Sequence, residues 1–123
     1  MGRRPKSTMT SFDRGDVVIV DLGMIAKTRP CVVVSIPKPD PERNMAVVVP
    51  MTTEIRGGQC EVGFPKPAWL KQASVVNVLG VAGVETARIE RRLTRFDAAA
   101  FAAVEVILAR ILGLKQLPSQ APA

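Results

Sequence analysis

Short runs of valine and other strand-forming residues, separated by glycine and proline, constrain the fold of this chain more than any other feature. Each run is too short for a typical helix and is rich in β-branched residues, which favour strands. Three prolines in the loop at 37–44 exclude a helix there, and Gly57-Gly58 indicates a hairpin turn. Such closely spaced short strands predict a small barrel of about five to seven strands. The runs fall at residues 17–22, 30–36, 45–50, 60–64 and 74–81, with a further short one within 83–89.

Residues 98–112 have the features of a single α-helix. They contain neither glycine nor proline, and their large apolar side chains recur at helical spacing. Thr94, with Asp97 three residues later, is the expected N-cap, and Gly113 stands where a C-terminal glycine ends a helix. We therefore expect a mainly β fold with helices (α+β), in which this helix packs on the barrel. The apolar stripe comprises Phe101, Val104, Ile107 or Leu108, and Ile111 or Leu112.

Length and charge limit the classes of function. A chain of 123 residues is one domain, which excludes a multidomain enzyme. We expect a disordered basic arm at 1–11, a barrel domain at 12–114 and a flexible tail at 115–123. Lys and Arg number 17 against 11 Asp and Glu, a net charge of +6. Such an excess of basic charge indicates a polyanionic partner, most often nucleic acid and less often an acidic protein.

The residue types that are absent exclude several kinds of site. The sequence has no His, so imidazole acid–base chemistry and His metal ligands are excluded. The two cysteines, Cys31 and Cys60, do not form a Cys-x-x-Cys pair, so a zinc knuckle and a thioredoxin-type motif are excluded. We predict no metal and no cofactor. Cys31 lies in an apolar run and is interpreted as a buried free thiol, while a Cys31–Cys60 disulfide stays open. No run is apolar enough for a membrane helix and no signal peptide is evident, so we expect a cytoplasmic protein.

Polar groups at the ends of two predicted strands are the best candidates for chemistry. Arg29 begins the second strand, and Thr52 follows the third. If these strands are antiparallel neighbours, a guanidinium and a hydroxyl meet at one end of the barrel, which suits a phosphate. Lys27 and Arg56 flank the same end and add positive charge. The alternative is structural: Arg29 pairs with Asp16 or Glu54, and the threonines only close a turn.

The order and spacing of four sequence blocks resemble the MazF/PemK family, the toxins of type II toxin–antitoxin modules. The resemblance covers residues 12 to about 114. It implies an SH3-like barrel that forms a homodimer and cleaves single-stranded RNA (mRNA) without metal, leaving 2′,3′-cyclic phosphate and 5′-hydroxyl ends. The blocks are RGDVVIVDL from Arg14 to Leu22, RPCVVVS from Arg29 to Ser35, VVVPMTT from Val47 to Thr53, and Ser74-Val-Val with Ala87-Arg-Ile89.

The resemblance also implies roles for individual residues. Arg29 and Thr52 match the positions that support the chemistry, Arg29 as an acid–base group or as a stabiliser of the phosphorane, and Thr52 as a hydrogen-bond donor to the scissile phosphate. Thr53 matches a neighbouring RNA contact, and Asn77 matches a position that is polar in some relatives. The implied partner is a cognate acidic antitoxin with a partly disordered tail that folds on binding and competes with RNA.

The chain departs from the family pattern at one important place. Members often have an acidic residue followed by Gln where this chain has Leu79-Gly80. Asp16 or Glu61 could supply a carboxylate instead. The alternative function is therefore a catalytically weakened module of the same fold that binds RNA or an antitoxin. A topoisomerase-poisoning toxin of the related CcdB type ranks last, because the end Leu114-Lys-Gln-Leu-Pro118 does not match such toxins.

Two further groups have competing interpretations. The arginines that precede the helix form either a solvated, partly self-paired rim or a phosphate-binding stripe. Trp69 and Phe64 could stack a base, but a tryptophan among prolines is more typical of a hydrophobic lid. The arginines in question are Arg88, Arg91, Arg92 and Arg95.

Overall fold

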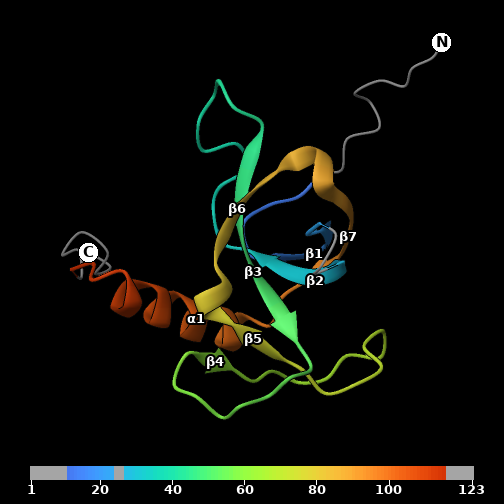
Figure 1. Cartoon of the computed structure of the whole chain (residues 1–123), viewed down its shortest axis with the longest axis vertical. Coiled ribbons are helices and arrows are strands. Elements are labelled where there is room, and N and C mark those ends of the chain that lie inside the picture. The colour runs from blue at the N-terminus through green and yellow to red at the C-terminus, as the bar shows by residue number, and fades with distance from the viewer. Residues whose placement is uncertain (1–10, 24–26, 116–123) are drawn as a thin grey trace.

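The computed structural model describes residues 11–23 and 27–115, which form seven strands and one α-helix (Figure 1). Short 3-10 turns lie at Val78–Gly80 and Thr86–Arg88. The predicted arm at 1–11 and tail at 115–123 fall, except for residues 11 and 115, outside the described residues. The strands are β1 (Asp16–Asp21), β2 (Thr28–Val33), β3 (Met45–Thr52), β4 (Glu61–Val62), β5 (Val75–Asn77), β6 (Ala82–Glu85) and β7 (Ile89–Arg95), and the helix is α1 (Ala98–Ile111).

All strand pairs are antiparallel, and β3 is the centre of the sheet. The strand order is β4-β5-β3-β2-β1-β7, and β6 pairs with the first half of β3. β2 pairs along one edge of β3 in the register Cys31↔Pro50, while β5 pairs along the other edge beside Met51 and Thr52. The predicted fold class is confirmed: a mainly β, barrel-like sheet with a C-terminal helix. Between the described strands β4 and β7, at the two ends of this order, the ladder does not close.

The continuous valine runs arise because both faces of the curved sheet are buried. In β1, Val17 packs in the core next to α1, whereas Val18 and Val20 pack in a second core on the opposite face. Val32 and Val33 of β2 divide in the same way. Successive side chains of a strand point to opposite faces, so strands between two cores need apolar residues at every position.

The helix forms as predicted, but its N-cap differs from the prediction. Asp97 is the cap, because its carboxylate accepts a hydrogen bond from the Ala100 amide at 2.9 Å. Thr94, the expected cap, lies instead within β7 opposite Val17. At the other end, Gly113 adopts a φ of 68° and its N–H donates to Arg110 O, as expected of a C-terminal glycine. Val104 and Ala100 are buried against the sheet.

β7 is the element that sequence patterning did not identify. The segment reads Ile-Glu-Arg-Arg-Leu-Thr-Arg, with the charged side chains exposed and Ile89 buried. It pairs with β1 through two register irregularities, so its apolar residues do not alternate regularly. Other boundaries shift too: β2 runs over Thr28–Val33 rather than 30–36, β4 is only Glu61–Val62, and the run at 74–81 divides into β5 and a 3-10 turn.

A buried carboxylate joins β1 to β7. The Asp16 side chain is 3% exposed and accepts hydrogen bonds from Arg92 Nε at 2.9 Å and from Arg95 Nη1 at 3.1 Å. The Asp13 amide donates to the same carboxylate at 2.9 Å. Burial on its own raises the pKa of Asp16, but the hydrogen bonds from Arg92, the Asp13 amide and Arg95 outweigh it and hold the pKa below the ordinary value of 3.8.

No helix in the described part of the chain is long and apolar enough to span a membrane.

We predict that Asp16→Asn lowers the free energy of unfolding by about 2 kcal/mol at neutral pH, because it removes the charge that two arginines share in a buried site. The higher unfolding free energy of wild type persists above pH 3.8, the ordinary pKa of Asp16 in the unfolded chain. It is lost as the pH falls below that value, since the Asp16 carboxylate of the unfolded chain takes up a proton before that of the folded chain does. Urea unfolding of both proteins across this pH range measures the difference.

Asp13→Asn is the matched control, since the exposed side chain of Asp13 forms no ion pair among the described residues. Asp13 contacts Asp16 through its backbone amide and carbonyl, and its carboxylate acts on Arg92 only through longer-range charge. The unfolding free energy of this variant stays within about 0.5 kcal/mol of wild type. Equal effects of the two substitutions would contradict the assigned role of Asp16.

Both cysteines are free, so the Cys31–Cys60 disulfide that the sequence left open is absent. We predict that the two thiols differ in reactivity. Cys31 is buried, and burial raises its pKa to about 12 despite the opposing charge of Arg29. Cys60 is partly exposed. Ellman's reagent should titrate a single thiol in the native protein and both thiols in denaturant. Rapid native reaction of both would show that the Cys31 site opens readily.

Candidate nucleic-acid interface

Arg29 lies near the start of β2, where its side chain reaches across to β3. The residue pairs with Val20 of β1, and its Nη1 lies 3.5 Å from the carbonyl oxygen of Met51. Pro30 and Cys31 follow it into the sheet, so the backbone that carries Arg29 is fixed by the β1–β2 ladder. The guanidinium is thus held beside the peptide group that links Met51 to Thr52.

Arg29 lines a hollow of about 300 Å³, which we call the Arg29 hollow. Lys27 is at its mouth, in the left-handed conformation with a φ of 61°, and its N–H donates to Gly23 O at 2.8 Å. A non-glycine residue in this conformation is uncommon and costs conformational free energy. The lining residues are Lys27, Thr28, Arg29, Pro30, Met51, Thr53, Leu70 and Ser74.

Thr52 lines a second hollow of about 320 Å³, the Thr52 hollow. Its hydroxyl oxygen accepts a hydrogen bond from the Glu54 amide at 3.0 Å, which leaves the hydroxyl hydrogen available to donate outward. Asn77 of β5 faces Glu61 of β4 across the strand pair. The lining residues are Thr52, Glu54, Arg56, Glu61, Asn77 and Leu79.

The six predicted site residues therefore gather at one end of β3 but divide between two hollows. Arg29, Lys27 and Thr53 line the first, whereas Thr52, Arg56 and Asn77 line the second. Arg29 and Thr52 do not line the same hollow. Met51 and Thr53, the chain neighbours of Thr52, line the Arg29 hollow, whereas Thr52 lines the other one, because successive residues of an extended chain point to opposite sides. The two side chains instead flank the Met51–Thr52 peptide group from neighbouring strands.

Glu61 is a site residue whose position sequence reasoning could not assign. Its two carboxylate oxygens accept hydrogen bonds from the amides of Arg56 at 3.0 Å and Gly57 at 2.8 Å. Glu61 thereby holds the loop that carries Arg56 against the Thr52 hollow. The relevant strand is only two residues long, so no periodic pattern in the sequence marks it.

The structure contradicts the alternative in which Arg29 is neutralised by Asp16 or Glu54. Asp16 is occupied by Arg92 and Arg95, and Glu54 pairs with Arg56 at 3.2 Å. Within residues 11–23 and 27–115, no ion pair involves Arg29 or Lys27. These two cations are therefore available to an anion from outside the chain.

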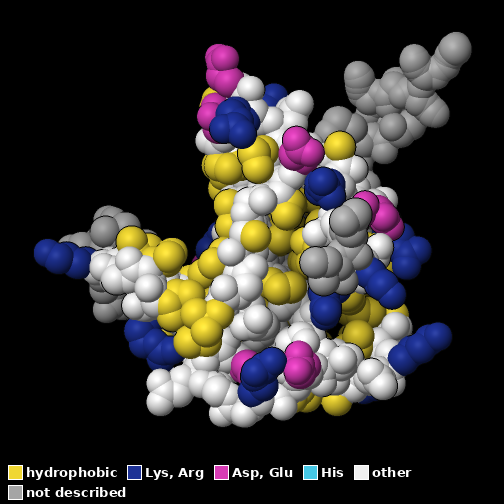
Figure 2. All heavy atoms as spheres, in the orientation of Figure 1, with side chains coloured by type: hydrophobic (Ala, Val, Ile, Leu, Met, Phe, Trp, Pro, Cys, Tyr) yellow, Lys and Arg dark blue, Asp and Glu magenta, His cyan; other side chains and the backbone are white. Residues whose placement is uncertain are grey.

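Three of the four arginines that precede the helix have acidic partners, as expected of a self-paired rim. Arg92 and Arg95 bind Asp16, and Arg88 lies 3.9 Å from Glu85. Figure 2 shows Lys and Arg side chains around the border of one face, several of them on the side where β1, β2 and β7 lie in Figure 1. In the described segments, no group of three or more Cys, Asp or Glu residues is arranged to hold a metal ion.

Leu79 and Gly80 have distinct structural roles. Leu79 lines the Thr52 hollow and is 65% exposed. Gly80 packs against Pro50, so closely that a Cβ atom at position 80 would lie 2.8 Å from Pro50 Cγ and 3.0 Å from Pro50 Cδ. A side chain at position 80 does not fit unless the proline ring moves.

Comparison with known proteins identifies relatives of the whole domain. A family model described as PemK-like, MazF-like toxin of type II toxin–antitoxin system matches residues 13–112. No curated protein matches the sequence.

Solved structures match the fold over most of the chain. A MazE–MazF complex from Deinococcus radiodurans has a TM-score of 0.69 at 24% identity, covering 85% of this chain and 97% of that one. An endoribonuclease from a mycobacterial species, in complex with its cognate antitoxin, has a TM-score of 0.72 at 23% identity, covering 87% and 100%. The toxin MazF-mt6 of Mycobacterium tuberculosis has a TM-score of 0.64 at 20% identity, covering 82% and 99%. At these identities the likeness shows a shared fold.

The close approach of Gly80 to Pro50 generates a stability prediction. Gly80→Ala should lower the free energy of unfolding by about 1–3 kcal/mol, because the added methyl group meets a rigid ring that cannot rotate away. Gly83→Ala is the matched control, since its nearest neighbour, Met45 Cε, would lie at an ordinary 3.6 Å. Urea denaturation compares the two, and equal midpoints would disprove the steric argument.

Proposed function

Because the chain belongs to the family of PemK-like, MazF-like toxins of type II toxin–antitoxin systems, we propose that it is an endoribonuclease that cleaves single-stranded RNA without a metal ion. The observation that carries this proposal is the guanidinium of Arg29, which has no acidic partner among the described residues and lies beside the backbone of Thr52 at one end of the sheet. Similar proteins that are described as endoribonucleases support the same activity.

In the proposed reaction, the 2′-oxygen of a ribose attacks the adjacent phosphorus while the bond from phosphorus to the 5′-oxygen breaks. The 2′-hydroxyl loses its proton and the departing 5′-oxygen gains one, so the products are a 2′,3′-cyclic phosphate and a 5′-hydroxyl. The pentacovalent intermediate carries additional negative charge on its non-bridging oxygens. Fixed donors aimed at those oxygens lower the barrier.

Arg29 and Thr52 are the residues proposed to supply these donors. A guanidinium keeps its proton at neutral pH, so Arg29 acts by charge and hydrogen bonding to the phosphate oxygens. The Thr52 hydroxyl oxygen accepts from Glu54 N–H, so its hydrogen is available to donate. Because Thr52 lines the neighbouring hollow, the proposal requires the scissile phosphate to lie over the Met51–Thr52 peptide group, between the two hollows. Neighbouring nucleotides would contact Lys27 and Thr53 in the Arg29 hollow, and Arg56 and Asn77 in the Thr52 hollow.

One observation favours a second candidate, a module that binds RNA or an antitoxin and cleaves weakly. The positions at which family members often have an acid and a glutamine are Leu79 and Gly80 here, and Pro50 leaves no room for a side chain at position 80. The two carboxylates of the Thr52 hollow have other partners: Glu54 pairs with Arg56, and Glu61 binds two backbone amides. Proton removal from the 2′-hydroxyl is therefore the step most weakened by these departures.

The proposed setting is that of a cytoplasmic homodimeric toxin whose activity is restrained by a cognate acidic antitoxin. Similar toxins occur in complexes, with MazE in Deinococcus radiodurans and with a cognate antitoxin in a mycobacterial species. The net charge of +6 suits an acidic partner. An acidic tail placed over Arg29 would exclude RNA from the same hollow.

We predict that the purified protein cleaves a long single-stranded RNA in EDTA and that Arg29→Ala reduces the rate at least about a hundredfold, because a fixed donor to the phosphorane is lost. Arg43→Ala is the matched control: it removes an equal charge from an exposed loop where Arg43 contacts only the sulfur of Met45, and the rate should be unchanged. Gel analysis with mapping of the fragment ends measures both rate and chemistry.

The same assay separates the two candidate functions. Fragments with 5′-hydroxyl ends that depend on Arg29 support the nuclease. RNA binding that depends on Arg29, with no 5′-hydroxyl fragments at high protein concentration, supports the binding module. Equal cleavage by wild type and Arg29→Ala would instead indicate a contaminating ribonuclease.

A further inference from the structure

Removal of the proton from the 2′-hydroxyl requires a group that accepts it, and the hollows at the end of β3 offer only carboxylates for this task. The chain has no His, and Lys and Arg side chains ordinarily carry their protons at neutral pH. Among the described residues, no acid lines the Arg29 hollow, whereas Glu54 and Glu61 line the Thr52 hollow. Asp97 lines a third hollow. These three carboxylates differ in how firmly each is already bound.

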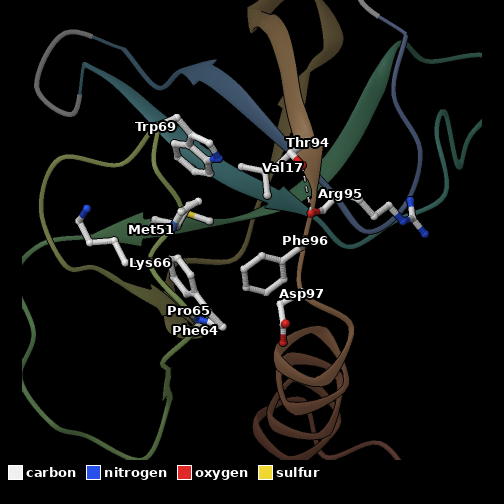
Figure 3. A pocket seen from close by; sticks show the side chains of 11 residues that line it. Val17, Met51, Phe64, Pro65, Lys66, Trp69, Thr94, Arg95, Phe96 and Asp97 are labelled. Atoms are coloured by element: carbon white, nitrogen blue, oxygen red, sulfur yellow. Dashed lines mark hydrogen bonds between the residues drawn. The ribbon is translucent and has the colours of Figure 1, made fainter.

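The third hollow, of about 310 Å³, lies on the β7 side of Met51 and is mainly apolar (Figure 3). We call it the aromatic hollow, because Trp69, Phe64 and Phe96 form much of its wall. Its acid, Asp97, accepts the hydrogen bond from the Ala100 amide that caps α1. This carboxylate is therefore committed to the helix.

Glu61 is committed to the backbone. Its two carboxylate oxygens each accept a hydrogen bond, from the amides of Arg56 at 3.0 Å and Gly57 at 2.8 Å. A ribose hydroxyl that took over one of these oxygens would release the loop that Glu61 supports. Glu61 therefore serves the shape of the Thr52 hollow rather than proton transfer within it.

Glu54 is the carboxylate that RNA can free. Its ion pair within the described segments is with Arg56, at 3.2 Å between Oε2 and Nη2, and the two side chains are 73% and 74% exposed. A pair so open to water contributes little stability and is easily exchanged. A guanidinium binds a phosphate strongly, through parallel hydrogen bonds. Arg56 can thus leave Glu54 for the backbone of a bound RNA, and the carboxylate then loses its counter-charge.

Glu54 is also held close to the residue proposed to bind the scissile phosphate. The Thr52 hydroxyl oxygen accepts a hydrogen bond from the Glu54 amide at 3.0 Å, so the chain turns directly after β3. Both side chains line the same hollow of about 320 Å³. A phosphate that accepts the Thr52 hydroxyl hydrogen therefore brings its adjoining ribose to the hollow that Glu54 lines.

We propose that Glu54 is the general base of the RNA cleavage reaction and that Arg56 releases it when RNA binds. The inference rests on the proposed function, because it assigns a residue to one step of that reaction. A Glu54 oxygen takes the proton of the 2′-hydroxyl while the 2′-oxygen bonds to phosphorus and the bond from phosphorus to the 5′-oxygen breaks. Water supplies the proton that the 5′-oxygen gains, and water afterwards removes the proton held by Glu54.

The test is single-turnover RNA cleavage by Glu54→Gln, which keeps the shape of the side chain and removes the base. The rate should fall about a hundredfold or more, the usual size of a general-base contribution. Affinity for a non-cleavable 2′-fluoro RNA should stay the same or rise, because a negative charge beside the phosphates is lost. Opposite effects on rate and affinity distinguish a base from a residue that only shapes the site.

Glu42→Gln is the matched control. It removes an equal charge from the exposed loop between β2 and β3, where the Glu42 side chain forms no ion pair within the described segments. Neither the cleavage rate nor the RNA affinity should change.

The pH dependence of cleavage is a second measurement. Wild-type cleavage should rise with pH and level off once Glu54 is ionised, whereas Glu54→Gln, left with hydroxide as its base, should rise without levelling. The other charged groups of the hollow, Arg56 on the same loop and Glu61 on β4, are present in both proteins. The groups that β5 and the following 3-10 turn contribute, Asn77 and Leu79, are uncharged.

The release of Glu54 is tested through Arg56→Gln. If Arg56 binds a phosphate, this variant should bind 2′-fluoro RNA more weakly, and the slope of log affinity against log salt should lessen by about 0.7, the value of one phosphate contact in a single strand. An unchanged slope would show that Arg56 does not leave Glu54 for RNA.

Three results would overturn the assignment of Glu54 as the base: wild-type cleavage by Glu54→Gln, loss of RNA affinity by the same factor as the rate, and a profile in that variant that still levels off as in wild type. In each case wild type still cleaves RNA, so the proposed nuclease stands. Absence of Arg29-dependent cleavage by wild type overturns both proposals, and it is recognised before any Glu54 variant is compared.

Discussion

The buried carboxylate of Asp16 is the interaction on which the rest of the arrangement depends. It binds Arg92 and Arg95 and thereby fixes β7 along β1, although the charged sequence of β7 has little apolar surface to hold it there. β7 leads directly into Phe96, which packs in the core, and into Asp97, which caps α1. The same interaction has an electrostatic consequence. Asp16, the one buried acid of the described residues, binds Arg92 and Arg95, and Arg29 has no acidic partner among those residues.

The end of β3 brings three chemically different surfaces together. Met51 points into the core between the Arg29 hollow and the aromatic hollow, and Thr52 faces the next hollow along. The alternation of an extended strand thus divides cation, hydroxyl and apolar groups among adjacent sites. An elongated ligand fits such a surface better than a compact one does, which suits both a nucleic-acid strand and an extended protein segment.

The sequence predicted the parts of the fold that depend on apolar patterning and strong end signals. Valine runs located β1, β2 and β3, and the stripe around Val104 with Gly113 located the helix. The positions of Arg29 and Thr52 at the ends of two predicted strands also indicated that they lie at one end of the sheet. The sequence could not reveal β7, whose register along β1 is irregular and whose arginines bind Asp16. Nor could it reveal that the side chains of Arg29 and Thr52 line different hollows. It also missed Asp97 as the cap, because Thr94 offered an equally plausible signal, and it could not place Glu61, whose partners are backbone amides.

The contact between Gly80 and Pro50 limits how this protein could acquire the acid–glutamine pair that many relatives have. An acidic side chain at position 79 meets no such obstacle, since Leu79 is largely exposed. A glutamine at position 80, by contrast, meets the Pro50 ring, which must either move or be replaced by a smaller residue. Positions 50 and 80 are therefore coupled in any evolutionary or engineered path toward the common pattern, since a substitution at 80 alone carries the cost of displacing the proline ring.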